Sequence, residues 1–536
     1  MSDANVHGGF SKVASRLTRE IPSLLVEHGI PGMAVGVCDR SGVTWSAGFG
    51  VNALGRADPV TTQTMFSIQS GSKMYTATAV MLAVQQGMLE LDASVTTYLP
   101  EFTVRSRWEP APQERMTLCH LLSHRAGFTH EAPLGGNFDD RDSSFEEHCR
   151  SISDTWLRFP VGHHYEYSNL GIDLAGYIVQ RVSGIPFHAF VQKELLDPLG
   201  LRRTTFDHAS IAQDRDRAVG HSGHSDQVPL RVPMVGAGGA YTSIDDALRY
   251  LQFHLAGGHG VLHEDLLKQM YEIPNPLPGQ RFGYGLGVAV ARWNGRRILN
   301  HGGGGFGFQS DMAWDPAAGI AVATLTNTDH PVPSHLASDI LCELTGDEPS
   351  TPEVPSAVEL DPATLGGIAG AYIGRGGTLA RIDLDGSKLL LHRGEATQIL
   401  APVSENEVVV EDDGNQRFRL LGHDGRPGRA YLVSADDGVT YYRSDPPIVT
   451  DDAMVRSYAI DYMGTQAVTL QLRTGRDATT LEAHGLLELP PLELTAQAPG
   501  LYFCPMGEAL DLTASPPTYA NIPFERRPPI RTYDLR

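Results

Sequence analysis

The chain has little positive charge and very little lysine. Of 536 residues, 42 are Lys or Arg against 63 Asp or Glu, so the formal net charge is −21. This balance argues against a nucleic acid or an anionic membrane as partner, because both require a basic face. It fits a protein that acts on neutral or cationic small molecules. Lysine itself occurs five times, at Lys12, Lys73, Lys193, Lys268 and Lys388.

Cysteine and long apolar runs are also scarce. The five cysteines are scattered without a CxxC pair or metal-ligand spacing, which predicts buried free thiols in a reducing compartment. No apolar run is long enough to span a bilayer, and the segment 1–7 lacks the apolar core of a signal peptide. We therefore expect a cytoplasmic protein; if a leader has been removed, the location would instead be periplasmic or secreted.

The first part of the chain, residues 1–345, patterns as an α+β domain. An amphipathic helix is expected over 11–29, followed by strands at 33–37 and 43–49. Residues 90–275 are mainly helical, and strands return at 285–292, 296–300, 309–314 and 320–327, before a helix at 335–343. Strands at both ends and helices between them predict one antiparallel sheet, built from both ends, flanked by helices and a helical subdomain.

The composition changes after residue 345. Residues 346–361 are expected to form a linker, because Pro, Ser and acidic residues dominate 346–355. Beyond it, short β-rich runs alternate with Asp-Gly pairs at 385–386, 413–414, 424–425 and 437–438, which are strong hairpin signals. We expect an antiparallel β domain over 362–445. Residues 446–536 form either a second β domain or the second half of one barrel.

Ser70 and Lys73 form the first candidate chemical group. If a helix begins here, the three-residue spacing places both side chains on one face. A desolvated lysine can act as the base that a serine nucleophile needs. The Ser70 backbone N–H, at the positive end of a helix expected over 72–86, can stabilise an oxyanion. The alternative is a surface lysine beside a serine that caps a helix.

Two further polar clusters follow. In Tyr167-Ser168-Asn169, a tyrosine beside a lysine can relay a proton to a leaving group, and an asparagine amide suits a substrate amide. The alternative is a polar turn with Asn169 as a helix cap. In the run His301 to Gly305, glycines on a strand edge allow a ligand to approach closely. Gly304 could supply a second oxyanion N–H. His301 could donate to a substrate carbonyl or carboxylate, or be a structural histidine.

The order Ser-x-x-Lys, Tyr-x-Asn, His-x-Gly resembles the penicillin-recognising serine hydrolases, over roughly residues 15–345. That family contains class C β-lactamases, D-alanyl-D-alanine carboxypeptidases, D-aminopeptidases and esterases. The stretches 66–70, 120–127 and 238–243 support the likeness. The resemblance implies a Ser70 acyl-enzyme, with Lys73 and Tyr167 moving protons. It also implies that Asn169, His301, Gly302 and Gly303 bind substrate, with an oxyanion hole formed by the N–H groups of Ser70 and Gly304.

One departure from the family pattern affects the expected substrate. Class C β-lactamases usually carry Lys-Thr-Gly where His301-Gly302-Gly303 stands here, and a neutral histidine attracts a carboxylate less strongly. The His-Gly-Gly form and the β-rich extension, which resembles lipocalin-like barrels, look more like the D-aminopeptidases. We expect hydrolysis of a short peptide or amino-acid amide, D-residues among the candidates. The alternatives are a carboxylesterase or a weak β-lactamase, and a thioesterase or transacylase is left open.

Other classes of protein fit the sequence less well. A metallohydrolase would show clustered ligands, and an α/β-hydrolase would show Gly-x-Ser-x-Gly at a strand-to-helix elbow; neither occurs in a suitable context. A catalytically silent protein that binds peptides or peptidoglycan fragments would be expected to have lost Ser70, Lys73 or Tyr167. We therefore expect an enzyme without cofactor or metal that takes a small molecule or short peptide. Whether it forms a homo-oligomer is left open.

Overall fold

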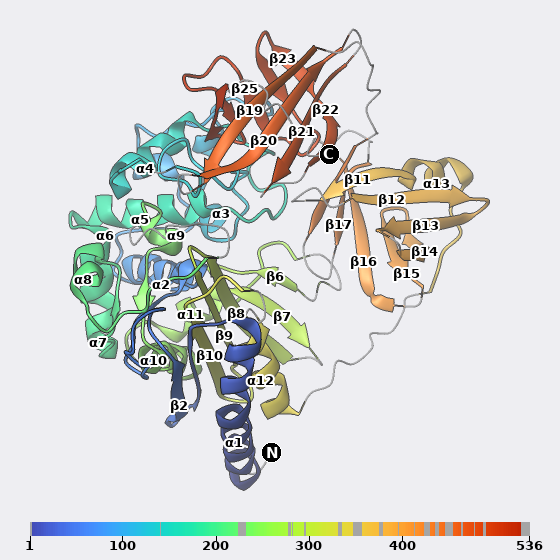
Figure 1. Ribbon diagram of the computed structural model, residues 1–536. Coiled ribbons are helices and arrows are strands. Elements are labelled where there is room, and N and C mark those ends of the chain that lie inside the picture. The colour runs from blue at the N-terminus through green and yellow to red at the C-terminus, as the bar shows by residue number, and fades with distance from the viewer. Residues whose placement is uncertain are drawn as a thin grey trace, which may run out of the picture.

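A computed structural model provides the three-dimensional structure of the chain (Figure 1). It describes residues 3–526 apart from positions 140, 223–231, 277–279, 281, 294–295, 331–334, 347–355, 375–378, 395, 412, 423–428, 435–438, 445–453, 463–464, 476–477 and 486–488. Much of the predicted linker, and the Asp-Gly pairs at 424–425 and 437–438, lie outside the described residues. None of the helices in these stretches combines the length and apolar character that crossing a bilayer requires.

A seven-stranded antiparallel sheet organises the first part of the chain. Its order is β2-β1-β10-β9-β8-β7-β6. The strands are β1 Gly32–Asp39, β2 Gly42–Gly50, β6 Phe282–Tyr284, β7 Ala289–Trp293, β8 Arg296–Gly305, β9 Phe308–Asp315 and β10 Ile320–Thr326. β1 pairs with β10 over its length, from Met33 opposite Thr326 to Asp39 opposite Ile320. The prediction of one sheet made from both ends of the domain is confirmed.

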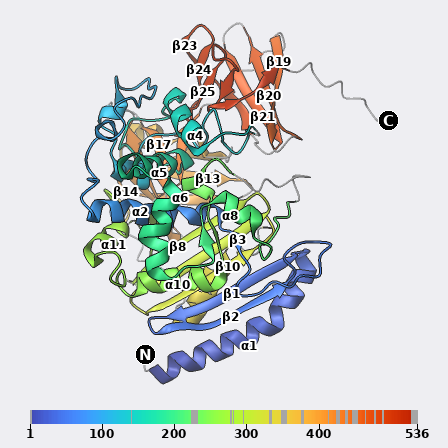
Figure 2. The same cartoon turned by 90° about the vertical axis from the view of Figure 1, so that its left-hand side faces the viewer.

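Helices cover both faces of this sheet. α1 (Asp3–His28) and α12 (Leu336–Thr345) pack on one face, and Figure 2 shows α1 running along β1 and β2. Alternate residues of β1, Met33 and Val35 among them, join the buried cluster beneath α1. The other face of β1 meets α10 (Ile244–Leu255) so closely that a Cβ on Gly36 would lie 2.5 Å from Leu248 Cδ1.

The middle of the domain is helical, as predicted. Its larger elements surround α2 (Ser72–Gln85), which is buried along most of its length. The helix predicted over 72–86 is therefore confirmed. The other helices here are α3 Leu118–Leu122, α4 Phe145–Ser151, α5 Asn169–Ser183, α6 Phe187–Val191, α7 Asp197–Leu199, α8 His208–Gln213, α9 Val235–Gly238 and α11 Glu264–Met270. A small sheet of order β3-β5-β4 joins Phe66–Ser67, Tyr241–Thr242 and Thr204–Thr205.

Two strand predictions differ from the structure. The strand expected from Gly285 begins only at Ala289, because residues 285–288 form a turn closed by Gly285 N–H donating to Val288 O at 2.8 Å. This turn lies against α2, where a Cβ on Gly287 would be 2.3 Å from Ala77 Cβ. The strand expected to end at Asn300 instead continues as β8 through the glycines to Gly305, since these glycines pair with β9.

The C-terminal part of the described chain is almost entirely antiparallel β structure. After a short helix, α13 (Pro362–Ile368), eight strands close a barrel in sequence order. They are β11 Gly370–Gly374, β12 Leu379–Asp385, β13 Lys388–Arg393, β14 Ala396–Ser404, β15 Glu407–Val410, β16 Asp413–Gly422, β17 Arg429–Ser434 and β18 Thr440–Arg443. Asp385-Gly386 does connect two strands, whereas Asp413-Gly414 begins β16. The α13 helix was not predicted.

Two five-stranded sheets, here called the terminal sheets, follow the barrel (Figure 1). One has the order β22-β21-β20-β19-β28 and the other β23-β24-β25-β26-β27. Their strands are β19 Met454–Tyr462, β20 Thr465–Thr474, β21 Thr479–Gly485, β22 Leu489–Glu493, β23 Thr495–Ala498, β24 Leu501–Phe503, β25 Ala509–Asp511, β26 Thr518–Tyr519, β27 Ile522–Pro523 and β28 Glu525–Arg526. The barrel therefore closes within 370–443, and the later strands form separate sheets.

Candidate active site

Ser70 lies in a tight turn directly before α2. It belongs to the 3-10 turn Gln69–Gly71, and its side chain is only half-buried, so it can be reached. The turn is held at Ile68, whose carbonyl accepts from Gly71 N–H at 2.9 Å and from Ser310 Oγ of β9 at 2.8 Å. Gln69 has φ 47°, a left-handed conformation that costs a non-glycine residue on the order of 1 kcal/mol. The backbone is therefore locally strained at the residue before Ser70.

Lys73 lies one turn further, within α2, and is completely buried. Its Nζ has three oxygen neighbours: Ser70 Oγ at 2.9 Å, Asn169 Oδ1 at 2.8 Å and Ala237 O at 2.9 Å. The hydrogen bond between Nζ and Ser70 Oγ joins the predicted Ser-Lys pair. Because Lys73 is completely buried, the alternative of a surface lysine is wrong. Asn169 Oδ1 and Ala237 O, which face a lysine nitrogen, can only accept.

The same geometry suits an amine that acts as a base. A neutral amine has two N–H bonds and one lone pair. Its two N–H bonds would point at Asn169 Oδ1 and Ala237 O, which leaves the lone pair facing Ser70 Oγ. The Ser70 proton can then pass to Nζ along an existing hydrogen bond, within the reach that general-base catalysis needs.

Asn169 is the first residue of α5, and it is buried. The helix cap is Ser168, whose Oγ accepts from Leu170 N–H at 3.2 Å, so Asn169 is not itself the cap. Asn169 is free to direct Oδ1 at Lys73, and its Nδ2 faces Met234 Sδ at 3.5 Å. Because a thioether is a weak acceptor, Nδ2 remains available to a stronger one.

Tyr167 reaches the site from the segment before α5. Its ring centroid lies 4.9 Å from Lys73 Nζ and 4.4 Å from the ring of His124. His124 Nδ1 also accepts from Ser168 N–H at 3.2 Å, so this histidine holds the backbone next to Tyr167. The tyrosine is half-buried.

His301, on β8, lies beside Tyr167, with 6.4 Å between the two ring centroids, and with its neighbours is here called the His301 wall of the site. Its Nδ1 lies 2.6 Å from Gly302 O, and its Nε2 lies 2.6 Å from the Tyr284 hydroxyl. A carbonyl only accepts, so Nδ1 carries the proton and Nε2 accepts from Tyr284. Burial, with Lys73 nearby, lowers the pKa of His301 to about 3, and burial raises the pKa of Tyr284 well above its usual range. The ring is therefore neutral, with both nitrogens engaged.

The glycines after His301 allow β8 to pass against the Ser70 turn. A Cβ on Gly303 would lie 2.1 Å from Ile68 O and 2.6 Å from Ser70 N, which no side chain could occupy. Gly303 pairs with Ser310 and Gly304 with Gln309. This close approach brings Gly302, Gly303 and Gly304 next to the turn that carries Ser70, as an oxyanion hole shared by two segments requires.

Several supporting residues were missed by the sequence analysis. Ala237 contributes only a backbone carbonyl, which no motif reveals. Asp173 of α5 holds it: Oδ1 accepts from Ala237 N–H at 2.9 Å, while Oδ2 lies 3.2 Å from His148 Nε2. Asp173 and His148 are both fully buried. Burial lowers the pKa of His148, but the hydrogen bond to Asp173 and the charge of Asp173 raise it, and the net result is a raised pKa. Tyr284, the partner of His301, carried no recognisable signal either.

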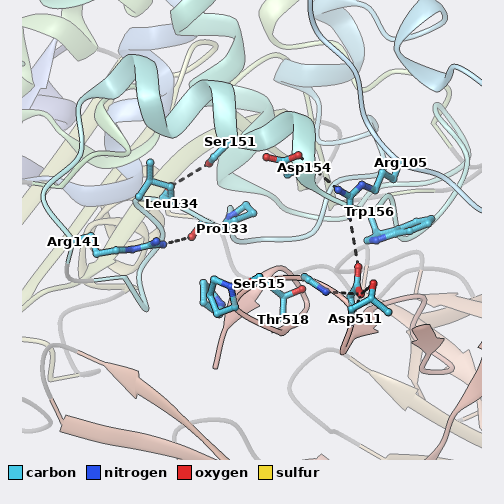
Figure 3. Close-up of a pocket in the computed structure, with 14 residues that line it drawn as sticks. Arg105, Pro133, Leu134, Arg141, Ser151, Asp154, Trp156, Asp511, Ser515 and Thr518 are labelled. Atoms are coloured by element: carbon cyan, nitrogen blue, oxygen red, sulfur yellow. Dashed lines mark hydrogen bonds and ion pairs between the residues drawn. The ribbon is translucent and has the colours of Figure 1, made fainter. Parts of the chain in front are cut away.

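The described residues offer no obvious metal site and one notable second cavity. Nowhere in the described ranges do three His, Cys, Asp or Glu side chains come together to hold a metal ion. A cavity of about 430 Å³ lies between the α4 region and the terminal sheets (Figure 3). Arg105 there lies 3.7 Å from Asp154 and 3.6 Å from Asp511, so its charge is balanced. No serine–lysine pair lines this cavity.

Together, the fold and the site define a serine hydrolase with a helix-flanked antiparallel sheet. The family model described as Beta-lactamase matches residues 14–344, more than half of the chain. The chain therefore belongs to the beta-lactamase family, as its three motifs predicted, and it is a hydrolase with a C-terminal barrel.

Curated relatives of several activities are similar to this chain. The unguisins hydrolase ungD' of Aspergillus campestris is 28% identical over 56% of this chain, which spans only 59% of that relative. Esterase EstB of Burkholderia gladioli is 28% identical over 59% of this chain and 91% of its own length. A D-aminopeptidase of Gluconobacter oxydans is 27% identical over 77% of this chain and 80% of its own.

A solved structure shares the fold over most of the chain. The octameric penicillin-binding protein homologue from Pyrococcus abyssi matches with a TM-score of 0.54 and 21% identity. The match covers 89% of this chain and 98% of that one. At this identity the likeness concerns the fold alone.

Proposed function

We propose that Ser70 is acylated by an amide of a short peptide or amino acid that carries no carboxylate beside the scissile bond. The observation that supports this most directly is the His301 wall. The ring is neutral, and both of its nitrogens already have partners. A neutral histidine attracts the carboxylate of a β-lactam antibiotic less strongly than the lysine that class C β-lactamases usually carry at this position. A neutral wall of this kind is better matched to an uncharged substrate.

Acylation would begin at the Ser70–Lys73 hydrogen bond. Nζ accepts the Ser70 proton as Oγ attacks the substrate carbonyl carbon, forming a C–O bond and moving the carbonyl π pair onto oxygen. The N–H groups of Ser70 and Gly304 would stabilise this oxyanion. Asn169 Nδ2, which faces only a sulfur, would donate to an amide carbonyl of the substrate.

Collapse of the intermediate requires a proton for the leaving amine. The Tyr167 hydroxyl would supply it as the C–N bond breaks, and the proton on Lys73 would restore the phenol. Water would then attack the acyl-enzyme with the same groups acting in reverse, which releases the acid and regenerates Ser70. The net reaction is amide plus water giving acid plus amine, with no further reactant.

Two relatives support the choice of substrate. The D-aminopeptidase aligns over both parts of the chain, so D-residue peptides or amides are the first candidates. Esterase EstB aligns along nearly its whole length and makes carboxyl esters the second candidate on the same residues. An ester needs less assistance at the leaving group, so Tyr167 would matter less for it.

A labelling and hydrolysis experiment tests this proposal. The wild-type chain should react with a fluorophosphonate at Ser70 and hydrolyse amino-acid p-nitroanilides or short acyl esters faster than a chromogenic cephalosporin. Ser70→Ala should lose labelling and at least about 10⁴-fold in kcat with the fold unchanged by circular dichroism. Ser15→Ala on the exposed face of α1 is the matched control. Labelling without any turnover would instead indicate a binding protein, and unchanged turnover in Ser70→Ala would reject the mechanism.

A further inference from the structure

The two residues that flank Tyr167 are both buried, although neither is proposed to react. Glu166 is 7% exposed and Ser168 is 3% exposed. A buried carboxylate requires partners, because leaving it unpaired costs several kcal/mol. The partners of both residues lead out of the hydrolase domain and into the C-terminal part of the chain.

Glu166 contacts Tyr442 of the barrel and Arg158 directly, and Arg158 links it to the terminal sheets. Tyr442, on barrel strand β18, donates its hydroxyl to Glu166 Oε2 at 3.3 Å. Arg158 Nη1 lies 3.3 Å from Glu166 Oε1. The same Nη1 lies 3.7 Å from Glu508 of the terminal sheets, and Arg158 Nε donates to Met506 O at 3.2 Å. The barrel and the terminal sheets therefore converge on one carboxylate beside Tyr167.

Ser168 is held by a second, separate chain of contacts. Its Oγ donates to Thr129 O at 2.5 Å. Thr129 Oγ1 in turn accepts from Asn521 Nδ2 at 2.6 Å, and Asn521 Oδ1 accepts from Trp156 N–H at 3.2 Å. Asn521, between β26 and β27, is 2% exposed and has φ 66°. The terminal sheets thus also reach the residue that follows Tyr167.

The backbones meet closely at this junction. A Cβ on Gly507 would lie 2.3 Å from Arg158 O, and Gly507 has φ 84°. Only glycine allows the terminal sheets to approach the hydrolase domain to this distance. The packing is therefore tight at Gly507, and Glu166, Ser168 and Asn521 are buried, so the loss of one of their hydrogen bonds leaves a buried polar group without its partner.

We propose that the barrel and the terminal sheets position Tyr167, through Tyr442 on Glu166 and through Asn521 and Thr129 on Ser168; this rests on the proposed function of Tyr167. The C-terminal part of the chain then acts on the rate of acylation and not only on the choice of substrate. A displacement of a catalytic group by about 1 Å can cost up to about 10²-fold in rate. Tyr442 and Asn521 are positioning residues, since neither touches the reacting atoms.

Two substitutions in the full-length protein test the idea. Tyr442→Phe removes one hydroxyl and keeps the ring. Asn521→Gly removes the amide and tolerates the left-handed backbone. Each should lower the acylation rate constant about three- to tenfold, with KM changed less than twofold, when measured from the release of p-nitroaniline by an amino-acid p-nitroanilide, an amide whose leaving group needs a proton, and normalised by fluorophosphonate titration. Tyr372→Phe is the control, because its buried hydroxyl donates to Ile368 O within the barrel and α13 region.

A double-mutant cycle with Tyr167→Phe separates positioning from a general loss of stability. Once Tyr167 lacks its hydroxyl, Tyr442→Phe should slow acylation by less than about twofold more. If Tyr442→Phe retains its full effect in that background, or leaves acylation unchanged in the wild type, the positioning role is overturned. If Tyr167→Phe alone leaves acylation unchanged, the proposed role of Tyr167 fails first. Release of p-nitroaniline that labelling does not assign to Ser70 would overturn the proposed function itself.

Discussion

The two walls of the active site place a basic side chain at similar depth and use it in different ways. Lys73 is fully buried and His301 is 5% exposed. On the Lys73 wall, all three neighbours of Nζ are oxygens, and two of them can only accept. On the His301 wall, one nitrogen faces a carbonyl and the other faces a phenol that donates to it.

This difference shows that burial alone does not determine what a basic group does. The chemistry of the partners decides whether a nitrogen presents a lone pair, an N–H bond, or neither, to the substrate. At Lys73 the fixed acceptors leave one position of the nitrogen for the Ser70 proton. At His301 both nitrogens already have partners, so under the proposed function this wall would present a neutral ring to the substrate. One wall is suited to proton transfer and the other to selection.

Replacing the lysine should give the largest effect and would remove the contrast between the walls. Lys73→Met keeps the length and apolar stem of the side chain but deletes the nitrogen. Acylation of Ser70 should slow by about 10³-fold or more, because general-base assistance contributes about 10²–10⁴-fold. Stopped-flow measurement of the ester burst checks this. Lys268→Met, on the exposed face of α11, is the matched control and should leave the burst unchanged. A lysine-free site that still acylates rapidly would assign the base to another group.

The neutrality of the His301 wall predicts how stability depends on pH. The pKa of His301 is lowered to about 3 in the folded chain, against about 6.5 when unfolded, so the unfolded chain binds the extra proton first. Stability should therefore fall as the pH drops from 7 through 6.5 toward 3. Between pH 7 and pH 5 this one group should cost about 2 kcal/mol.

Urea denaturation of His301→Asn at both pH values measures that contribution. Whatever its stability at pH 7, the variant should lose about 2 kcal/mol less than the wild type on going to pH 5. His392→Asn, in the barrel and a third exposed, provides a control histidine that should not change the difference. An equal loss in wild type and His301→Asn would mean that folding does not lower the pKa of His301.

The smallest effect should come from making the walls alike. His301→Lys restores the amine that a class C β-lactamase carries here, and a cation would attract the carboxylate of a cephalosporin. Repulsion from Lys73 limits the gain, so the ratio of cephalosporin to ester acylation should rise about tenfold, equivalent to 1.4 kcal/mol. Competition between the two chromogenic substrates measures the ratio directly. No change in the ratio would show that substrate charge is selected elsewhere.

Local patterns predicted much of this molecule. The spacing of Ser70 and Lys73, the buried α2 helix and the amphipathic α1 helix depend on residues close in sequence, and the structure has them as expected. The order of the three motifs was enough to identify the family. Contributions by backbone atoms or distant partners could not be predicted. Ala237 contributes a backbone carbonyl, which any residue has. Tyr284 lies next to His301 only because β6, β7 and β8 pair with one another.

The β8 glycines show the same limit in another form. A run of glycines is typical of a loop, and we expected the strand to end at Asn300. In the structure the glycines remain in the strand because β9 pairs with them and the Ser70 turn lies against them. Tertiary contacts therefore outweigh local preference at the place where the site is assembled.

The pairing of β1 with β10 has a consequence for synthesis of the chain on the ribosome. Met33 emerges early, but its partner Thr326 is translated almost three hundred residues later. The N-terminal hairpin must wait with an open hydrogen-bonding edge, and such edges invite aggregation. A nascent chain arrested before Gly303 would already contain Ser70, Lys73 and Tyr167 but would lack Gly303, which lies against the Ser70 turn, and the whole of β9, which pairs with it. The sheet beside Ser70 can therefore be completed only once the chain has been translated as far as β10.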